Sequence, residues 1–140
     1  MTSFNDLGLN SEILAAIVES GYHKPTPIQK KAIPEALTGK DILGIAQTGT
    51  GKTASFTLPI ISLLSKGRAR ARIARSLVLC PTRELAAQVA TNFENYARNT
   101  KLSKALLIGG ESFEDQKFRL TRYRDDVYSR VKLDGGLPDI

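Results

Sequence analysis

The segment Ala46–Thr53 combines residue types and a spacing that suit the binding of phosphate groups. It reads Ala-Gln-Thr-Gly-Thr-Gly-Lys-Thr and stands between a short apolar run and a helical pattern. Glycines allow positive φ angles, so successive N–H groups can face phosphate oxygens, and the N-terminus of the following helix adds partial positive charge. Lys52 can reach the β- and γ-phosphates, and the Thr53 hydroxyl suits a Mg²⁺ ligand. We therefore expect a nucleotide triphosphate with Mg²⁺, Lys52 and Thr53 as catalytic residues, and Thr53 as the metal ligand.

The phosphate-binding residues that we expect are Ala46, Gln47, Thr48, Gly49, Thr50, Gly51, Lys52 and Thr53. The common pattern G-x-x-x-x-G-K-[ST] is not met strictly, because Ala46 occupies its first glycine position. The cradle itself depends mainly on Gly49, Gly51 and Lys52. A turn that merely joins two elements is the alternative, but such a turn does not require Lys-Thr at a helix start. The loop alone indicates neither which base the nucleotide carries nor which reaction the protein catalyses.

The elements around this loop are predicted from hydrophobic periodicity. Asp41–Ala46 is expected to be a short buried strand, and a helix should begin at Lys52. This order is that of a strand, a glycine loop and a helix. The residues of that helix expected to face a core are Phe56, Ile60, Ile61 and Leu64.

Two helices are predicted before the loop. The first covers Asn10–Ser20, with Asn10 and Ser11 as candidate caps and Gly21 as its end. The second begins near Pro27, where Thr26 would be the N-cap and Gln29 would complete a capping box, and it should stop at Gly39.

Strands and helices alternate after the loop. Ser76–Cys80 and Ala105–Ile108 are predicted strands, and Arg83–Asn99 is a predicted helix between them. Alternation of this kind favours right-handed crossovers and a parallel sheet with helices on both faces, which is the α/β class. Lys66–Arg75 carries five positive charges without an acid, so we expect an exposed connection there.

Composition excludes several classes of protein. A chain of 140 residues allows one domain or part of one. Cys80 is the only cysteine and His23 the only histidine, so an intramolecular disulfide and a zinc site of Cys and His are excluded, and a cytoplasmic location fits. Apolar runs are shorter than the roughly 18 residues of a membrane span. A net charge of +6 favours a polyanionic partner such as nucleic acid.

Four motifs together resemble those of the DEAD-box ATP-dependent RNA helicases, most closely the bacterial members. They are Gly21–Gln29 (Gly-Tyr-His-Lys-Pro-Thr-Pro-Ile-Gln), Ala46–Thr53, Pro81–Ala86 (Pro-Thr-Arg-Glu-Leu-Ala) and Gly109–Gly110. Phe4 precedes Gly21 by seventeen residues, where the family has an isolated aromatic residue, so the resemblance covers Phe4 to Gln116. It implies a RecA-like P-loop domain with a parallel sheet flanked by helices, here incomplete.

The resemblance implies a role for two residues in selecting ATP. Gln29 would hydrogen-bond the adenine edge, and Phe4 would stack on its face. A carboxamide does offer a donor beside an acceptor, which matches adenine N6 and N7. The alternatives are that Gln29 serves only the capping box and that Phe4 is simple core.

The resemblance also implies contacts with an RNA backbone. Pro81, Thr82 and Arg83 follow a predicted strand, and from the residues alone this is a Thr N-cap at an exposed helix start that could grip a phosphate. The family assigns this motif to RNA, and its order favours a close approach of RNA at Gly109 and Gly110 over a plain turn. RNA, and through it ribonucleoprotein assemblies, are the expected partners, with no membrane and no defined oligomeric state.

The pattern breaks after Gln116. Residues 1–116 match the N-terminal portion of the helicase ATP-binding domain, whereas 117–140 form a divergent tail without the Thr-Pro-Gly-Arg, Asp-Glu-Ala-Asp or Ser-Ala-Thr motifs. Leu120, Tyr123, Val127 and Val131 keep a helical spacing. We expect a truncated piece with a missing central strand that binds ATP but neither hydrolyses it nor unwinds RNA alone. Another P-loop NTPase, such as a small nucleotide kinase, and a non-catalytic RNA-binding fragment are the alternatives.

Overall fold

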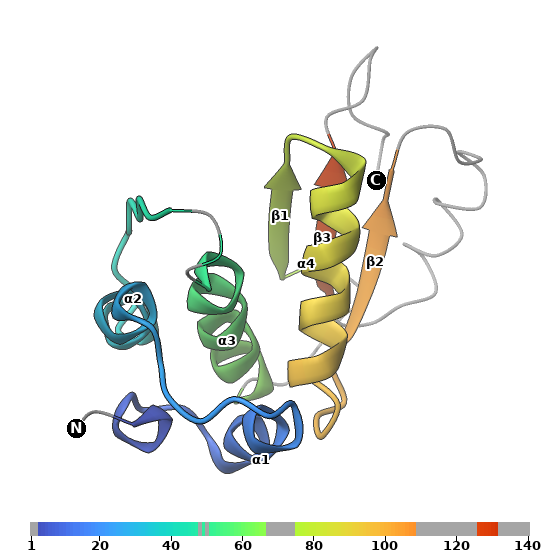
Figure 1. Cartoon of the computed structure of the whole chain (residues 1–140). Coiled ribbons are helices and arrows are strands. Elements are labelled where there is room, and N and C mark those ends of the chain that lie inside the picture. Colours follow the sequence, from blue (N-terminus) through green and yellow to red (C-terminus); the bar gives the residue numbers. More distant parts are fainter. Residues whose placement is uncertain (1–2, 48, 50, 67–74, 109–125, 132–140) are drawn as a thin grey trace. The chain divides into compact units, whose positions relative to one another are not determined.

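The computed structural model describes residues 3–47, 49, 51–66, 75–108 and 126–131. The chain divides into two compact units, one of Met1–Gly67 with Asn92–Lys101 and the other of Arg68–Thr91 with Leu102–Ile140. The glycine loop belongs to the first unit and the parallel sheet to the second (Figure 1).

The first unit begins with a short 3₁₀ helix, η1 (Phe4–Asp6), and helix α1 (Ser11–Glu19). Asn10 caps α1 because its Oδ1 accepts a hydrogen bond of 3.1 Å from the N–H of Ile13. Gly21 follows the helix with a φ of +83°, a conformation in which glycine is favoured. The predicted cap and the predicted end of this helix are both confirmed.

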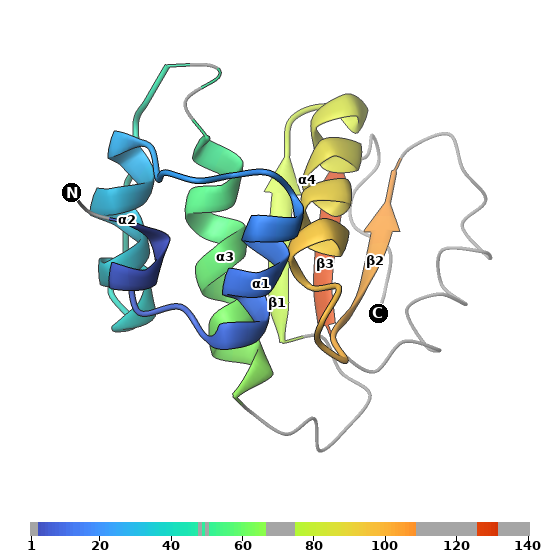
Figure 2. The same ribbon diagram turned by 60° about the horizontal axis from the view of Figure 1, so that its bottom comes forward.

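Helix α2 spans Pro27–Leu37 and α3 spans Lys52–Ser65. Pro27 stands at the start of α2, where its missing N–H costs nothing, and Gly39 with a φ of +82° follows its end. Helices α2 and α3 pack against each other, as both ribbon views show (Figures 1 and 2). The bounds predicted for α2 and the start predicted for α3 are confirmed.

The predicted core face of α3 is only partly right. Ile61 is fully buried as expected, together with Leu58, but Phe56 remains 37% exposed. Phe56 and Ile60 are four residues apart, so they share a stripe of the helix that is turned away from Leu58 and Ile61. That stripe lines a groove and not the core.

The strand predicted at Asp41–Ala46 is wrong. These residues have no regular secondary structure, and Leu43 and Ile45 are 89% and 84% exposed. A parallel strand forms only by pairing with neighbours, and among the described residues of its own unit this segment has no strand beside it. The apolar run alone therefore did not determine a strand.

The second unit holds a sheet of β1 (Ser76–Cys80), β3 (Asp126–Val131) and β2 (Ser103–Leu107), in that spatial order. Both pairings are parallel, with Ser76 opposite Val127 and Ser103 opposite Asp126. The predicted parallel sheet is confirmed. β3 lies between the other two described strands, while the expectation that a central strand of the family's sheet is missing stays a prediction.

The helix suggested by the spacing up to Val131 is wrong over Asp126–Val131, which is β3. Val127 and Val131 are separated by four residues, a distance that fits one helical face and also one face of a strand, so the spacing is ambiguous. Leu120 and Tyr123, like the arginine-rich positions 67–74, lie outside the described residues.

Helix α4 (Arg83–Tyr96) covers one face of this sheet and ends three residues before the predicted Asn99. Its Ala86 and Val89 pack on Cys80 in a core that also includes Val78, Leu85, Leu106 and Ile108. Leu77 and Leu79 of β1 are 53% and 65% exposed.

Among the described residues, no helix has the length and hydropathy that crossing a membrane requires.

Candidate functional site

The glycine loop has the backbone geometry expected of an anion site. Gly49 and Gly51 have φ angles of +83° and +79°, and no other type of residue in the described ranges has a positive φ. Gly51 is the N-cap of α3 and supplies no side chain to cap the first N–H groups of that helix. The first turn also contains no acidic residue. The N-terminus of α3 therefore keeps backbone donors and partial positive charge for a bound anion.

Gln29 contacts this loop directly, although twenty-two residues separate it from Gly51. Its Nε2 donates a hydrogen bond of 3.1 Å to the Gly51 carbonyl, and its Oε1 accepts one of 3.0 Å from the N–H of Thr26. Only 6% of Gln29 is exposed. A Cβ at position 51 would lie 2.3 Å from Gln29 Nε2, so the approach requires glycine there.

Thr26 and Gln29 form the predicted capping box: Oε1 of Gln29 accepts a hydrogen bond from the N–H of Thr26, and the Thr26 side chain faces the backbone of Gln29 in return. Thr26 Oγ1 is buried. It lies 3.4 Å from the position that a Cβ of residue 51 would take. The sequence predicted Thr26 as a cap and gave no sign that its hydroxyl faces the glycine loop.

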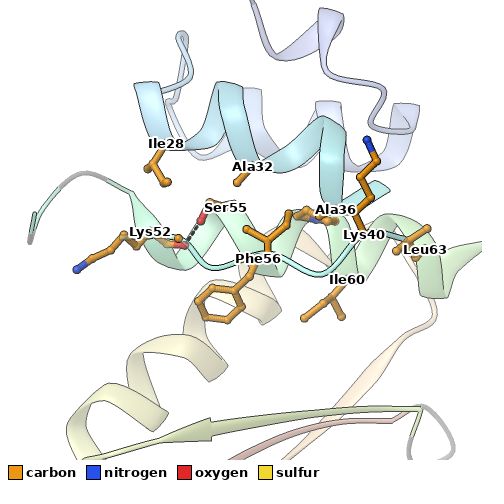
Figure 3. Close-up of a pocket in the computed structure, with 12 residues that line it drawn as sticks. Ile28, Ala32, Ala36, Lys40, Lys52, Ser55, Phe56, Ile60 and Leu63 are labelled. Carbon is orange, nitrogen blue, oxygen red and sulfur yellow. Dashed lines mark hydrogen bonds between the residues drawn. The ribbon is translucent and has the colours of Figure 1, made fainter. Parts of the chain in front are cut away.

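The remaining loop residues are placed as follows. Gln47 and Lys52 are exposed, and Ala46 is half-buried. Lys52 starts α3 and extends away from its neighbours, while its carbonyl accepts a hydrogen bond from Ser55 Oγ (Figure 3). Thr53 is half-buried, and its carbonyl accepts a 3.0 Å bond from Thr57 Oγ1. Thr48 and Thr50 lie outside the described residues.

A groove of about 450 Å³ runs along α3 from Lys52 to Leu63, so it shares Lys52 with the glycine loop. Its walls are mostly apolar side chains of α2 and α3, with Lys40 and Lys52 among the lining residues (Figure 3). Lys40 is paired with Glu35 at 2.7 Å. Among the described residues, the charged or hydroxyl side chains that line the groove are Lys40, Lys52 and Ser55.

Phe4 is 7% exposed and forms part of the core. It belongs to η1, which is held by a 2.8 Å hydrogen bond from the N–H of Ser3 to Asp6 Oδ2. This backbone hydrogen bond, and then that of the Ser3 hydroxyl, lower the pKa of the Asp6 carboxyl. The stacking of Phe4 on a base stays a prediction.

Pro81, Thr82 and Arg83 are exposed at the start of α4. Thr82 is its N-cap, as predicted, because Oγ1 accepts a hydrogen bond of 3.1 Å from the N–H of Leu85. Gly109 and Gly110 lie outside the described residues. The first unit therefore contains the glycine loop and Gln29 in contact with it, and the second unit contains the start of α4, which is expected to bind RNA.

Two buried groups outside these sites have shifted pKa values. Burial raises the pKa of the Cys80 thiol, which keeps it protonated. Burial, and then Tyr22, raise the pKa of Tyr96, whose ring centroid lies 6.3 Å from that of Tyr22.

A glycine loop that opens a long helix, in a chain that also carries a parallel sheet, defines a nucleotide-binding α/β protein of the P-loop class. The family model for the DEAD/DEAH box helicase matches residues 26–131. The chain belongs to this family, which decides against the small nucleotide kinase. The match continues past Gln116, while the boundary between residues 1–116 and 117–140 stays a prediction.

Individual relatives agree with this assignment. The ATP-dependent RNA helicase DBP10 of Scheffersomyces stipitis is 44% identical over 114 residues, which are 81% of this chain and 12% of that protein. The DEAD-box ATP-dependent RNA helicase RhpA of Helicobacter pylori is also 44% identical over 114 residues, 81% of this chain and 22% of that protein. A fungal and a bacterial protein thus match equally, so the bacterial members are not singled out.

Among solved structures, a DEAD box protein from the hyperthermophile Methanococcus jannaschii is similar, with a TM-score of 0.84 and 37% identity. The match covers 94% of this chain and 35% of that one. The predicted RecA-like fold is confirmed. The chain spans between 12% and 22% of the two curated relatives named above.

Proposed function

We propose that this chain binds ATP with Mg²⁺ through Ala46–Thr53 and Gln29, and that it contacts the backbone of RNA through Pro81–Arg83. In the parent activity that this implies, ATP binding and hydrolysis drive RNA unwinding. The observation that carries the proposal is the 3.1 Å hydrogen bond from Gln29 to Gly51. This bond connects the Gln29 amide, which suits the edge of adenine, with the glycine loop, which suits phosphate groups.

Gln29 has capacity for both the roles that the sequence left as alternatives. A glutamine amide has two donor hydrogens and two acceptor lone pairs. In this structure Nε2 donates to Gly51 and Oε1 accepts from Thr26, which leaves one hydrogen and one lone pair. Adenine presents an acceptor at N7 beside a donor at N6, which is the complementary pair. The capping role of Gln29 therefore does not prevent its amide from hydrogen-bonding to adenine.

The loop residues fit a Mg²⁺-bound triphosphate. Gly49 and Gly51 provide the positive φ angles that turn N–H groups toward an anion, and the uncapped start of α3 adds further donors. Lys52 would neutralise charge at the β- and γ-phosphates, and the Thr53 hydroxyl would hold the metal. The bound Mg²⁺ supplies charge stabilisation at the phosphates.

We further propose that the chain alone does not hydrolyse ATP. Phosphoryl transfer to water needs a carboxylate that holds Mg²⁺ and a group that orients the water. The sequence contains no Asp-Glu-Ala-Asp motif. Within the described ranges, no group of three or more His, Cys, Asp or Glu residues is placed to hold a metal.

The RNA contact is supported by the start of α4. Thr82 and Arg83 are exposed there, beside backbone donors that carry the partial positive charge of a helix N-terminus. We also propose a cytoplasmic protein of ribonucleoprotein assemblies, a role that the net charge of +6 supports. Residues 1–116 would form the N-terminal portion of the nucleotide-binding domain, and 117–140 its divergent tail.

Calorimetric titration of the 140-residue chain with Mg·ATP and Mg·GTP tests the nucleotide site. We expect preference for ATP in the wild type, loss of that preference in Gln29→Ala, and loss of binding to both nucleotides in Lys52→Ala. Lys31→Ala, which also removes an exposed lysine from a helix, is the matched control and should bind normally. Absence of heat from wild-type, folded protein would refute the site.

Fluorescence anisotropy with a labelled single-stranded RNA tests the second contact. Arg83→Ala should weaken RNA binding and lower the slope of log Kd against log salt by about one, because one phosphate contact is lost. Lys31→Ala again controls for net charge. An equal effect of both substitutions would reduce the contact to general electrostatic attraction.

A further inference from the structure

The end of α1 and the turn after it carry an exposed surface that the proposed function does not use. We call it the Tyr22 surface, and it consists of Val18, Tyr22, His23 and Lys24. Val18 and Tyr22 are 67% and 54% exposed, and both His23 and Lys24 are exposed. A single exposed apolar residue is common on a protein surface. An exposed aromatic ring next to a cation is the combination with which proteins bind single-stranded nucleic acid.

The backbone of this turn is fixed by hydrogen bonds to α1. The N–H of Gly21 donates to the Val18 carbonyl at 3.0 Å, and the N–H of Tyr22 donates to the Ile17 carbonyl at 3.2 Å. Gly21 has a φ of +83°, as is typical of a glycine that ends a helix. Tyr22 is therefore held at the end of α1, and a ligand that stacks on its ring has little backbone freedom to remove.

The side chain of Tyr22 is supported by Tyr96. The centroids of the two rings lie 6.3 Å apart, with an angle of 46° between their planes. Tyr96 is only 4% exposed, whereas more than half of Tyr22 is exposed. The Tyr22 ring is thus anchored on a buried neighbour and still offers apolar area to a flat partner such as a base.

The charges around the turn favour a phosphate. Between Ser20 and Pro34 the sequence has no acidic residue. The acidic residue just before the turn, Glu19, is paired with Arg98 at 3.1 Å. Lys24 therefore meets little local competition for an anion. A polyanion that also carries stacking rings fits this surface better than an acidic peptide, because the ring of Tyr22 adds affinity only for a partner that can stack.

We infer that the Tyr22 surface is a second contact for single-stranded RNA, in which one base stacks on Tyr22 and a phosphate binds Lys24. This inference rests on the proposed binding of RNA. It adds a contact in the first unit to the one proposed at Pro81–Arg83 in the second, and it needs no bound nucleotide.

Fluorescence anisotropy tests the stacking with two labelled RNAs, an oligouridylate and an oligonucleotide of the same length that lacks all bases. Tyr22→Leu should raise Kd for the oligouridylate at least about fivefold, the lower end for one stacked base. Its Kd for the RNA without bases should stay within about twofold of wild type. Tyr22→Phe keeps the ring and should bind like wild type. Phe56→Leu, which removes another partly exposed ring, is the matched control and should leave both Kd values unchanged.

The same titrations at several salt concentrations test the phosphate contact. Lys24→Ala should weaken the binding of both RNAs and lower the slope of log Kd against log salt by about one. Lys31→Ala removes an exposed lysine outside the Tyr22 surface and should leave the slope unchanged. Equal slopes in the two variants would overturn the assignment of a phosphate to Lys24.

A fluorescent base in the RNA, 2-aminopurine, reports stacking on the unaltered protein. We expect its emission to be quenched when the wild type binds and to recover in Tyr22→Leu. Circular dichroism shows whether each variant is folded. Should Tyr22→Leu fail to fold, the wild-type signal decides alone, because unquenched emission from bound RNA contradicts a stacked base.

The outcomes separate this inference from the proposed function. If wild type binds neither RNA, the proposed RNA binding fails and the second contact fails with it. If Arg83→Ala weakens binding and Tyr22→Leu does not, only the inference fails. An equal loss for both RNAs in Tyr22→Leu identifies a structural role of the ring and overturns the stacking. So does a Tyr22-dependent affinity for polyglutamate without one for RNA, which would make the partner an acidic protein segment.

Discussion

Replacing Gly51 by alanine should destabilise the protein far more than the same change at Gly39. Both glycines have nearly the same φ, +79° and +82°, so each substitution carries the backbone cost of a left-handed alanine, roughly 1–2 kcal/mol. Only Gly51 adds a collision, since the new Cβ would lie 2.3 Å from Gln29 Nε2 while nothing lies within 4 Å at Gly39. Gln29 must then move and leave its buried amide unpaired, which costs about 1–3 kcal/mol more.

The measurement is urea unfolding followed by circular dichroism for five proteins: wild type, Gly39→Ala, Gly51→Ala, Gln29→Ala and the double variant of positions 29 and 51. Gly51→Ala should lower the free energy of unfolding by about 2–5 kcal/mol and Gly39→Ala by about 1–2 kcal/mol. In the Gln29→Ala background the collision is absent, so Gly51→Ala should cost only its backbone share. The coupling between positions 29 and 51 is thus about 1–3 kcal/mol.

Two results refute this reasoning. Equal losses at Gly51 and Gly39 show that the loop does not approach Gln29 in solution. A coupling energy near zero shows that the two positions are independent, even if Gly51→Ala is severe. Either result removes the physical link between α2 and the phosphate loop.

Three further predictions concern the first unit. Ser62 is fully buried and its Oγ has no partner in the described part of the chain, so Ser62→Ala should raise the free energy of unfolding by about 1 kcal/mol in urea titrations, and a decrease contradicts this. Asn10→Ala should lower the free energy of unfolding by about 1–2 kcal/mol, because Asn10 caps α1 and its Nδ2 also donates a hydrogen bond of 2.7 Å to Ser65. A loss near zero in the same titration would show that Asn10 does not stabilise the helix. The pKa of Tyr96 is raised by burial and then by Tyr22 from an ordinary value of 10.0, so the unfolded chain releases a proton that the folded chain retains. The stability due to neutral Tyr96 is therefore complete below pH 10 and lost as the pH rises, and unfolding titrations from pH 8 to about 11 should show a steeper decline in wild type than in Tyr96→Phe.

Local signals in the sequence predicted the helices well. Asn10 and Gly21 mark the two ends of α1, because capping and positive φ depend on residues within one turn. Pro27 and Gly39 mark the two ends of α2 for the same reason. Strands β1 and β2 followed from short apolar runs, and their parallel direction followed from the alternation with helices.

Features that depend on distant partners were not predictable in this way. Asp41–Ala46 has the composition of a buried strand, but a strand exists only where a neighbour completes its hydrogen bonds. Residues 126–131 have a spacing compatible with a helix and form the central strand instead, because β1 and β2 both pair with them. The contact of Gln29 with Gly51 bridges twenty-two residues, and no local pattern encodes it.

The loop shows why an alanine in the first glycine position of the common phosphate-binding pattern is compatible with the site. Among the described residues, positive φ occurs only at glycines, and in the loop these are Gly49 and Gly51. Ala46 has a negative φ, so the backbone there requires no glycine and the alanine introduces no left-handed strain. The glycine that the geometry does require is Gly51, where both the angle and the proximity of Gln29 exclude a Cβ. The departure at Ala46 is therefore compatible with the proposed anion cradle, whose geometry depends on glycine at residue 51.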